Sequence, residues 1–390
     1  MSATPQLNAA HRQWATRPKD ERFWNLKEMH KHCSTIQERS AETCTGLDAL
    51  RVAATPNDDL VLTRGNGRLA FTNWSFGQLC RKIGAPAGFL TEMPAPLAAS
   101  CINEAIKLET KRDQQHSAVK LLHYQNGCAR LRALTGPDYG RIWNSDVTSR
   151  LIRLSEEQGW RTPPSRTGAM EGEESRPATE ADCMGASFIR PGDMISPGGL
   201  YASDRDMFAF MVDSQHPIND GSKDGLWRGF FAQNSEVGDC SWILTFFKFR
   251  GTCGNHIIHG GSLLREIRIR HVGSANDRAM QALRADLTEY MNQSATEDEK
   301  IIVQAKNLIL GADKDEVLDR LFGLKIATRQ ILGAAWDRAI ETATVDEDGS
   351  PDTAWGYTQA LTRYSQTLPW MDRRTDLDRA AGRVLALAYN

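Results

Sequence analysis

Side chains that can bind ligands or transfer protons are concentrated between positions 225 and 271, among aromatic and β-branched residues. These side chains are Arg228, Asn234, Glu236, Arg250, Cys253, Asn255, His256 and His271. Because strands direct successive side chains to opposite faces, and turns end them, several of these groups are expected to line one site. Their types allow ligand binding or proton transfer, and the sequence leaves the reaction open.

An acid–base or metal-assisted reaction would centre on three carboxylates. In this hypothesis Glu236 is the general base or a metal ligand, and Asp204 and Asp206 are ligands of the same divalent ion. His256 or His271 would then act as the acid. The hypothesis requires the strands that carry these residues to be neighbours.

The same stretch also has the composition of a nucleic-acid surface. From Trp227 to His271 there are six basic and three acidic residues, interleaved with aromatic residues, in a chain with a formal net charge of -2. Cations bind phosphates and aromatic rings stack on bases, so this pattern is typical of single-stranded nucleic-acid binding. The alternative is that the aromatic residues belong to the core. The predicted contacts are phosphates for Arg141, Arg228, Lys248, Arg250 and Arg270, and bases for Trp227 and Trp242.

Two further interpretations concern metal binding and structure. Cys253, His256 and His259, with Cys240 upstream, resemble a zinc site, but strand alternation places neighbouring members on opposite faces. We therefore assign no metal ligands, although a divalent ion stays open as a cofactor. Alternatively, the polar residues of this stretch form a buried network that only stabilises the fold.

The overall composition is that of a folded globular protein. The chain has 390 residues, 41% hydrophobic and 25% charged. Its eight cysteines include no CxxC pair, and no apolar run approaches the length of a membrane span. These features predict a cytoplasmic protein with reduced thiols and no membrane contact, and they leave open whether it forms a homo-oligomer.

Periodicity predicts the elements that position the polar residues. Hairpins are expected over Leu60–Thr72, with Asn66-Gly67 in its turn, and over Val119–Leu134. Further predicted elements are helices at 20–32, 76–83, 94–108 and 146–154, and strands at 185–189, 207–212, 230–232, 241–249 and 266–271. From position 274 onward helices follow one another. The predicted fold class is α+β, with a β-rich mixed core over 1–272 and an all-helical region over 273–390.

Six ordered motifs carry a family resemblance. They are FTNWSFGQLCRKIGAPAGFL, ARLRALTGPDYGRIW, GLYASDRDMFAFMVD, RGFFAQNSEVGDCSW, FRGTCGNHIIHG and IRHVG. From roughly Phe71 to His271, the chain resembles the phage- and plasmid-associated family called domain of unknown function 932. The resemblance implies a mobile-element context and recurrent polar positions, without an established activity. On this chain those positions are Arg132, Tyr139, Arg141, Asp204, Asp206, Arg228, Asn234, Ser235, Glu236, Gly238, Cys253, Asn255 and His271.

Together these observations favour a protein that binds single-stranded DNA or RNA, in replication, annealing or defence evasion. The alternative is an enzyme, such as a metal-dependent hydrolase or nuclease, in which Arg228 would hold the anionic substrate.

Overall fold

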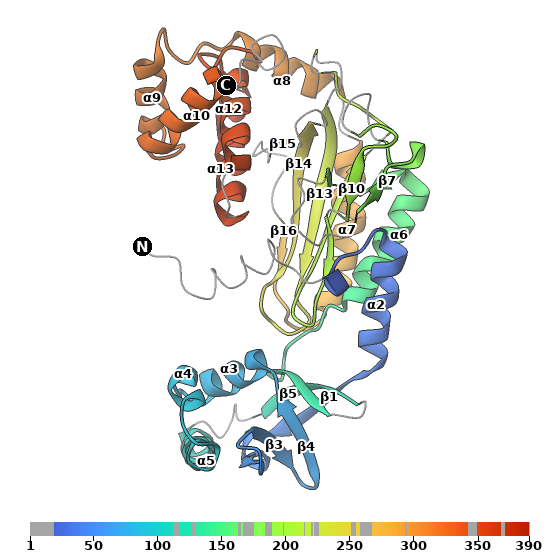
Figure 1. Ribbon diagram of the computed structural model, residues 1–390, viewed down its shortest axis with the longest axis vertical. Helices are drawn as coiled ribbons and strands as arrows, with labels where there is room; N and C mark the ends of the chain where they lie inside the picture. Colours follow the sequence, from blue (N-terminus) through green and yellow to red (C-terminus); the bar gives the residue numbers. More distant parts are fainter. Residues whose placement is uncertain are drawn as a thin grey trace.

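A computed structural model gives the arrangement of the chain (Figure 1). It describes residues 19–112, 118–125, 129–162, 165–166, 175–183, 189–197, 199–213, 215–219, 221, 226–250, 255–257, 267–292, 295–341, 349–367 and 371–389.

The N-terminal sheet consists of six strands with the order β1-β5-β6-β4-β3-β2. Its strands are β1 (Ser40–Gly46), β2 (Arg51–Ala54), β3 (Leu60–Arg64), β4 (Gly67–Phe71), β5 (Ala118–Tyr124) and β6 (Arg130–Thr135). Its helices are α3 (Asn73–Lys82), α4 (Ala87–Thr91) and α5 (Ala95–Arg112). Strands and helices bury one hydrophobic core that includes Leu62, Leu79 and Ile102, so this part of the chain has an interior of its own.

The central sheet runs β11-β12-β13-β14-β15, with β7 beside β12 and β16 beside β14. Its strands are β7 (Trp160–Arg161), β11 (Leu200–Ala202), β12 (Met207–Asp213), β13 (Leu226–Asn234), β14 (Trp242–Arg250), β15 (Asn255–Ile257) and β16 (Ile267–Ile269). All the pairings are antiparallel. β12 is buried at every position, as expected for a strand whose two faces are both covered.

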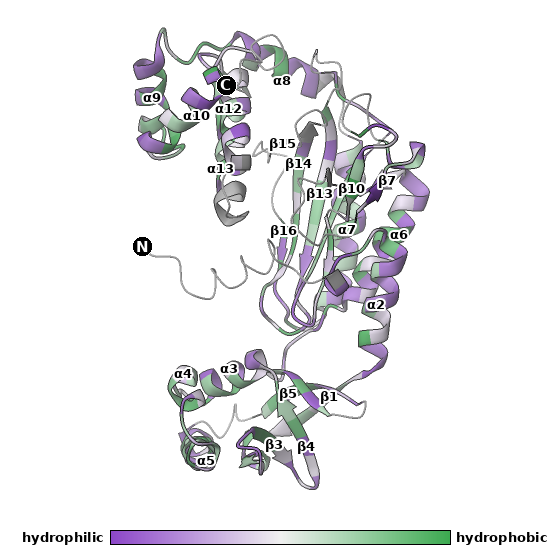
Figure 2. Ribbon diagram, viewed as in Figure 1, coloured by the Kyte–Doolittle hydropathy of each residue, from purple (hydrophilic) through white to green (hydrophobic). Residues whose placement is uncertain are grey.

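Three helices cover one face of the central sheet (Figure 1). They are α2 (Leu26–Glu38), α6 (Asn144–Gln158) and α7 (Ala275–Met291). Each helix buries one apolar stripe, and Figure 2 accordingly shows hydrophilic and hydrophobic residues alternating along α2 and α6. The opposite face carries a separate cluster of aromatic side chains that includes Phe208, Phe210 and Trp227.

The remaining helices form a third core at the far end of the central sheet from the N-terminal sheet (Figure 1). They are α8 (Ala295–Asn307), α9 (Lys314–Gly323), α10 (Arg329–Glu341), α12 (Ala354–Thr367) and α13 (Met371–Ala386). Leu226 of β13 and Ile218 of the segment before it also belong to this core. The helices therefore pack against the end of the sheet.

A small three-stranded sheet and four 3-10 turns complete the described elements. The sheet has the order β8-β10-β9, from β8 (Ser165–Arg166), β9 (Arg176–Pro177) and β10 (Met194–Ser196). The turns are η1 (Lys19–Glu21), η2 (Leu47–Ala49), η3 (Glu180–Asp182) and η4 (Leu387–Tyr389).

The predicted fold class is confirmed: the protein is α+β, with the sheets in the N-terminal and middle parts of the chain and helices toward the C-terminus. Both predicted hairpins form, as β3–β4 and β5–β6. The helix predicted at 20–32 instead begins at Leu26, where Asn25 accepts a hydrogen bond from the backbone N–H of Glu28 and caps it. In the first hairpin Gly65, rather than Asn66-Gly67, carries the positive φ.

Two other predictions concern the strand at 185–189 and the helical region from position 273 onward. The strand predicted at 185–189 lies almost wholly outside the described residues. The first helix of the predicted helical region, α7, packs against the central sheet rather than with the later helices. Within the described chain, no helix combines the length and the apolar character needed to cross a membrane.

Candidate functional site

The turn between β13 and β14 joins the central sheet to the N-terminal sheet. Val237, at its tip, is buried against Leu122 and Ala133 of the N-terminal sheet. Its carbonyl accepts hydrogen bonds from Trp74 Nε1 at 3.0 Å and from Gln78 Nε2 at 2.7 Å, both on α3. This turn therefore places the polar residues around it at the junction of the two sheets.

Glu236 in the same turn forms a buried ion pair with Arg132 of β6. Glu236 Oε2 lies 2.8 Å from Arg132 Nη2, and both side chains are 1% exposed. Glu236 Oε1 accepts the backbone N–H of Asn144 at 2.9 Å, at the first residue of α6, where the helix dipole favours an anion. Arg132 also donates to Ser40 Oγ at 3.0 Å and to the Asp204 carbonyl at 3.2 Å. Both oxygens of Glu236 are therefore engaged.

The residues that flank Glu236 are held just as firmly. The Asn234 amide nitrogen donates to the Ile142 carbonyl at 2.8 Å and to Asn144 Oδ1 at 2.7 Å. Ser235 Oγ donates to the Arg205 carbonyl at 2.6 Å. The turn and the N-terminus of α6 are thereby fixed relative to each other.

Tyr139 connects this turn to the segment that precedes α7. Its hydroxyl donates to the Ser235 carbonyl at 3.1 Å, and burial raises the pKa of the Tyr139 hydroxyl. Its ring stacks on that of His271 with centroids 5.0 Å apart and an interplanar angle of 1°. The Arg141 guanidinium lies 5.0 Å from the same ring, and Arg141 Nε donates to Glu42 at 2.7 Å.

We use the name junction network for Arg132, Tyr139, Arg141, Asn234, Ser235, Glu236 and His271. Its members come from four separated segments of the chain, and the contacts above join them. The structure thus brings residues near positions 139, 205, 235 and 271 together, whereas the side chain of Asn255 lies outside the described residues.

The surface beside the junction network combines half-buried aromatic rings with arginines. The Trp74 ring has two guanidinium groups near it, with the Arg81 group 5.7 Å and the Arg205 group 4.5 Å from the ring centroid. Arg205 also pairs with Asp239 at 3.0 Å. Trp143, which is also partly exposed, lies 5.7 Å from Arg141. We use the name junction surface for Trp74, Arg81, Trp143 and Arg205; Arg270, which precedes His271 in the chain, is also exposed.

A second charged cluster lies where the central sheet meets α8. Arg228 and Lys248, paired across β13 and β14, are 3% and 1% exposed, and both bind Asp298 of α8. The distance from Arg228 Nη2 to the Asp298 carboxylate is 3.0 Å. Burial lowers the pKa of the Lys248 ammonium. The cluster therefore connects α8 to the sheet from inside the protein, and the structure corrects the assignment of Arg228 and Lys248 as phosphate contacts.

Two predicted base-stacking residues are also placed in the interior. Trp242 is 0% exposed in the core beneath α2, α6 and α7, and Trp227 is 5% exposed in the aromatic cluster on the other face. Neither ring presents a face to a base, and the structure corrects this assignment in favour of the core role.

The three carboxylates of the metal hypothesis do not converge on one point. Asp204 is exposed and accepts the Tyr124 hydroxyl at 2.5 Å, and Asp206 accepts the Ser203 hydroxyl at 2.7 Å. Glu236 is occupied by Arg132. In the part of the chain that the structure describes, no group of three His, Cys, Asp or Glu side chains is arranged to hold a metal ion. The predicted shared ion therefore has no ligand set here.

Several predicted residues cannot be placed in a site. Cys253 lies outside the described residues. Asn255 and His256 are described only as backbone of β15, opposite Arg250 and Phe249. The side chain of Arg250 also lies outside the description. Their proposed roles stay predictions.

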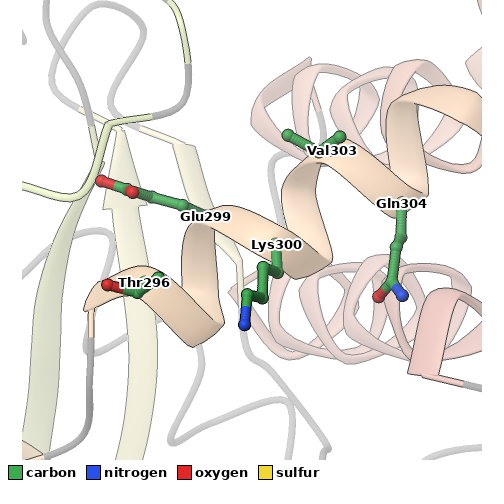
Figure 3. Close-up of a pocket in the computed structure, with 5 residues that line it drawn as sticks. All are labelled: Thr296, Glu299, Lys300, Val303 and Gln304. Carbon is green, nitrogen blue, oxygen red and sulfur yellow. The ribbon is translucent and has the colours of Figure 1, made fainter.

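A shallow depression of about 330 Å³ lies elsewhere, along α8 (Figure 3). Its lining residues are Thr296, Glu299, Lys300, Val303 and Gln304. All five belong to one helix, so the depression does not gather chemistry from separate segments, and it includes no member of the junction network.

The sequence interpretation missed several partners. Trp74 and Gln78 lie within the first family-like motif, but nothing in the local sequence marks an aromatic or amide residue as a contact of a distant turn. Nothing in the local sequence distinguishes Glu42 or Asp298 from charged residues that face solvent. Each instead binds a buried cation from far along the chain.

Comparison with known proteins found no matching family model, no similar curated protein and no similar solved structure. The resemblance to the domain of unknown function 932 therefore stays a prediction.

Proposed function

We propose that the protein binds single-stranded nucleic acid along the junction surface. The observation that carries the proposal is the position of arginine guanidinium groups within cation–π distance of half-buried aromatic rings beside the junction network. Trp74 carries two such groups, from Arg81 and Arg205, and Trp143 lies beside a third.

This pairing suits unpaired bases and their phosphates. Bases stack on aromatic rings and on guanidinium planes, while the guanidinium N–H groups can donate to phosphate oxygens. Arg81 and Arg270 are exposed, and the Arg205 side chain is 29% exposed, so their polar ends are accessible. The chain has a formal net charge of -2, so binding would depend on this local surface rather than on overall charge.

The rigid surroundings also support binding. Trp74 is fixed by its hydrogen bond to Val237, and Arg205 is fixed by Asp239. Side chains that are already ordered lose less conformational entropy when a ligand binds.

The proposal is tested by fluorescence anisotropy with labelled single-stranded DNA and RNA oligonucleotides, titrated at several salt concentrations. Binding should weaken as salt rises. Replacing two phosphate contacts, as in R81Q/R205Q, should reduce the slope of log K against log salt by about 1.4, because each contact to a single strand contributes about 0.7.

Arg284→Gln is the matched control. Arg284 is an exposed arginine on α7, outside the junction surface, and its replacement should leave the slope unchanged. Equal losses in R81Q/R205Q and R284Q, or no binding at low salt, contradict the proposal.

A further inference from the structure

Arg141 brings buried nitrogens to the junction network that have no hydrogen-bond partner there, and His271 is a second buried polar residue of the same network. Each residue is 7% exposed, and the Arg141 side chain only 2%. Among the described residues, no hydrogen-bond partner reaches Arg141 Nη1 or Nη2, whereas the polar group next to the His271 ring is the backbone of Gly140. Buried charged donors without acceptors are costly, and folded proteins keep few of them.

The neighbouring Arg132 shows how the same network treats an arginine with a structural role. Its two terminal nitrogens reach the Ser40 hydroxyl, the Asp204 carbonyl and the Glu236 carboxylate. Arg141 has only its Nε engaged, by Glu42. The two terminal nitrogens of Arg141, whose geometry suits two oxygens of one acceptor, are therefore available to a ligand.

The charges around Arg141 also favour an anion. Lys120 Nζ donates to the Tyr139 carbonyl at 2.7 Å, so a second cation lies close by. Glu42 supplies one carboxylate against these two cations, while Glu236 is already paired with Arg132. One more negative charge would balance this side of the junction.

Tyr139 holds the two residues in place. The Arg141 guanidinium and the His271 ring each lie 5.0 Å from the Tyr139 ring. Burial lowers the pKa of His271 to about 4, so near neutral pH its ring is uncharged and can both donate and accept one hydrogen bond. A ligand that binds both residues needs two oxygens for the guanidinium and a further oxygen for the imidazole. A tetrahedral phosphate has these oxygens, whereas a planar carboxylate has two.

We propose that Arg141 and His271 form a buried site for a phosphate monoester, which in this protein is the terminal phosphate of a bound single strand. The assignment to a strand terminus rests on the proposed function. Burial favours a terminus because a phosphate inside a strand would have to bring chain into the junction on both sides. Glu42, which binds Arg141 Nε, is the more exposed member of that ion pair, with its side chain 35% exposed.

The experiment compares three probes on the full chain: inorganic phosphate, an oligonucleotide with a 5′-phosphate, and the same oligonucleotide with a 5′-hydroxyl. Anisotropy should show the phosphorylated strand binding about tenfold or more tightly, the size expected for charge-assisted hydrogen bonds. Inorganic phosphate should compete with that advantage and should raise the melting temperature relative to chloride at equal ionic strength.

Variants assign the effect to the two residues. Arg141→Gln and His271→Gln should each remove most of the preference for the phosphorylated strand, while Arg284→Gln keeps it. Because the Arg141 variant can also fail to fold, Glu42→Gln provides an independent check at a more exposed position. Removing this carboxylate should strengthen the preference, since it takes away the negative charge next to the site.

Equal affinities for the phosphorylated and hydroxyl strands overturn the terminal-phosphate site, and they leave the proposed function standing if both strands bind. If neither strand binds but inorganic phosphate stabilises the protein through Arg141, both the terminal assignment and the proposed function fail, and free phosphate is the ligand. A preference that survives in Arg141→Gln and His271→Gln overturns the assignment to these residues.

Discussion

Glu236→Gln is predicted to destabilise the protein strongly, because it leaves Arg132 as a buried charge without its carboxylate. Both side chains are 1% exposed and 2.8 Å apart, so water cannot replace the lost partner. Breaking a buried ion pair in this way typically costs about 3–5 kcal/mol, a large fraction of the stability of a folded domain. Glutamine has the shape of glutamate and can still accept a hydrogen bond from the Asn144 N–H. The decrease in the free energy of unfolding therefore reports the contribution of the negative charge.

The assay is urea denaturation followed by far-ultraviolet circular dichroism and tryptophan fluorescence, with separate fits if the two probes do not coincide. Glu156→Gln is the control, because its pair with Lys27 is exposed, at 58% and 77%, and should contribute less than about 1 kcal/mol.

The double variant R132M/E236Q distinguishes pairing from general damage. Arg132→Met alone should also destabilise the protein, since it leaves Glu236 charged and buried. The double variant removes both charges, so its loss should be well below the sum of the two single losses. A loss below about 1 kcal/mol for Glu236→Gln, or additive single losses, contradicts the view that this ion pair joins the two sheets.

Three further predictions concern stability. His271 has a folded pKa of about 4 against an ordinary value of 6.5, so the folded protein binds fewer protons between these values. The free energy of unfolding should therefore fall by at most about 3 kcal/mol as pH drops through this window, and denaturation of His271→Gln at several pH values should lack this component. Gly140→Ala should lower the melting temperature, because its Cβ would lie 2.1 Å from the Gly273 carbonyl oxygen, whereas Gly136→Ala has open space and should not. Asp298→Asn should cost about 3–5 kcal/mol in urea denaturation, because it leaves two buried cations without their carboxylate; an unchanged midpoint would show that the cluster does not hold α8.

Local sequence patterns predicted the elements well and their partners poorly. The hairpins and the buried strand β14 follow from turn residues and apolar runs, which act over a few positions. The charged residues at 20–22 resemble a first helical turn, so the sequence predicts a helix start that is too early. The capping side chain belongs to Asn25, and α2 begins after it.

The candidate site was predicted in part. That residues near 139, 205, 235 and 271 meet could be expected from their common position in turns beside strands, and the side chain of Asn255 lies outside the described residues. Whether a given charged side chain is exposed could not be predicted, because its burial depends on an oppositely charged partner that is distant in the sequence. The sequence predicts that Lys248 contacts phosphate. In the structure Lys248 binds Asp298, fifty positions away in sequence, inside the protein. Trp74 and Trp242 differ in the same way, since tertiary packing alone decides which ring reaches the surface.

Binding of a single strand at the junction surface is tested most directly by the salt-dependent anisotropy titration of the unmodified protein. The account predicts binding of single-stranded DNA or RNA that weakens steeply between about 50 and 200 mM salt, and that loses part of this dependence in R81Q/R205Q but not in R284Q. Absence of binding at the lower salt concentration, or binding that salt does not affect, would contradict it.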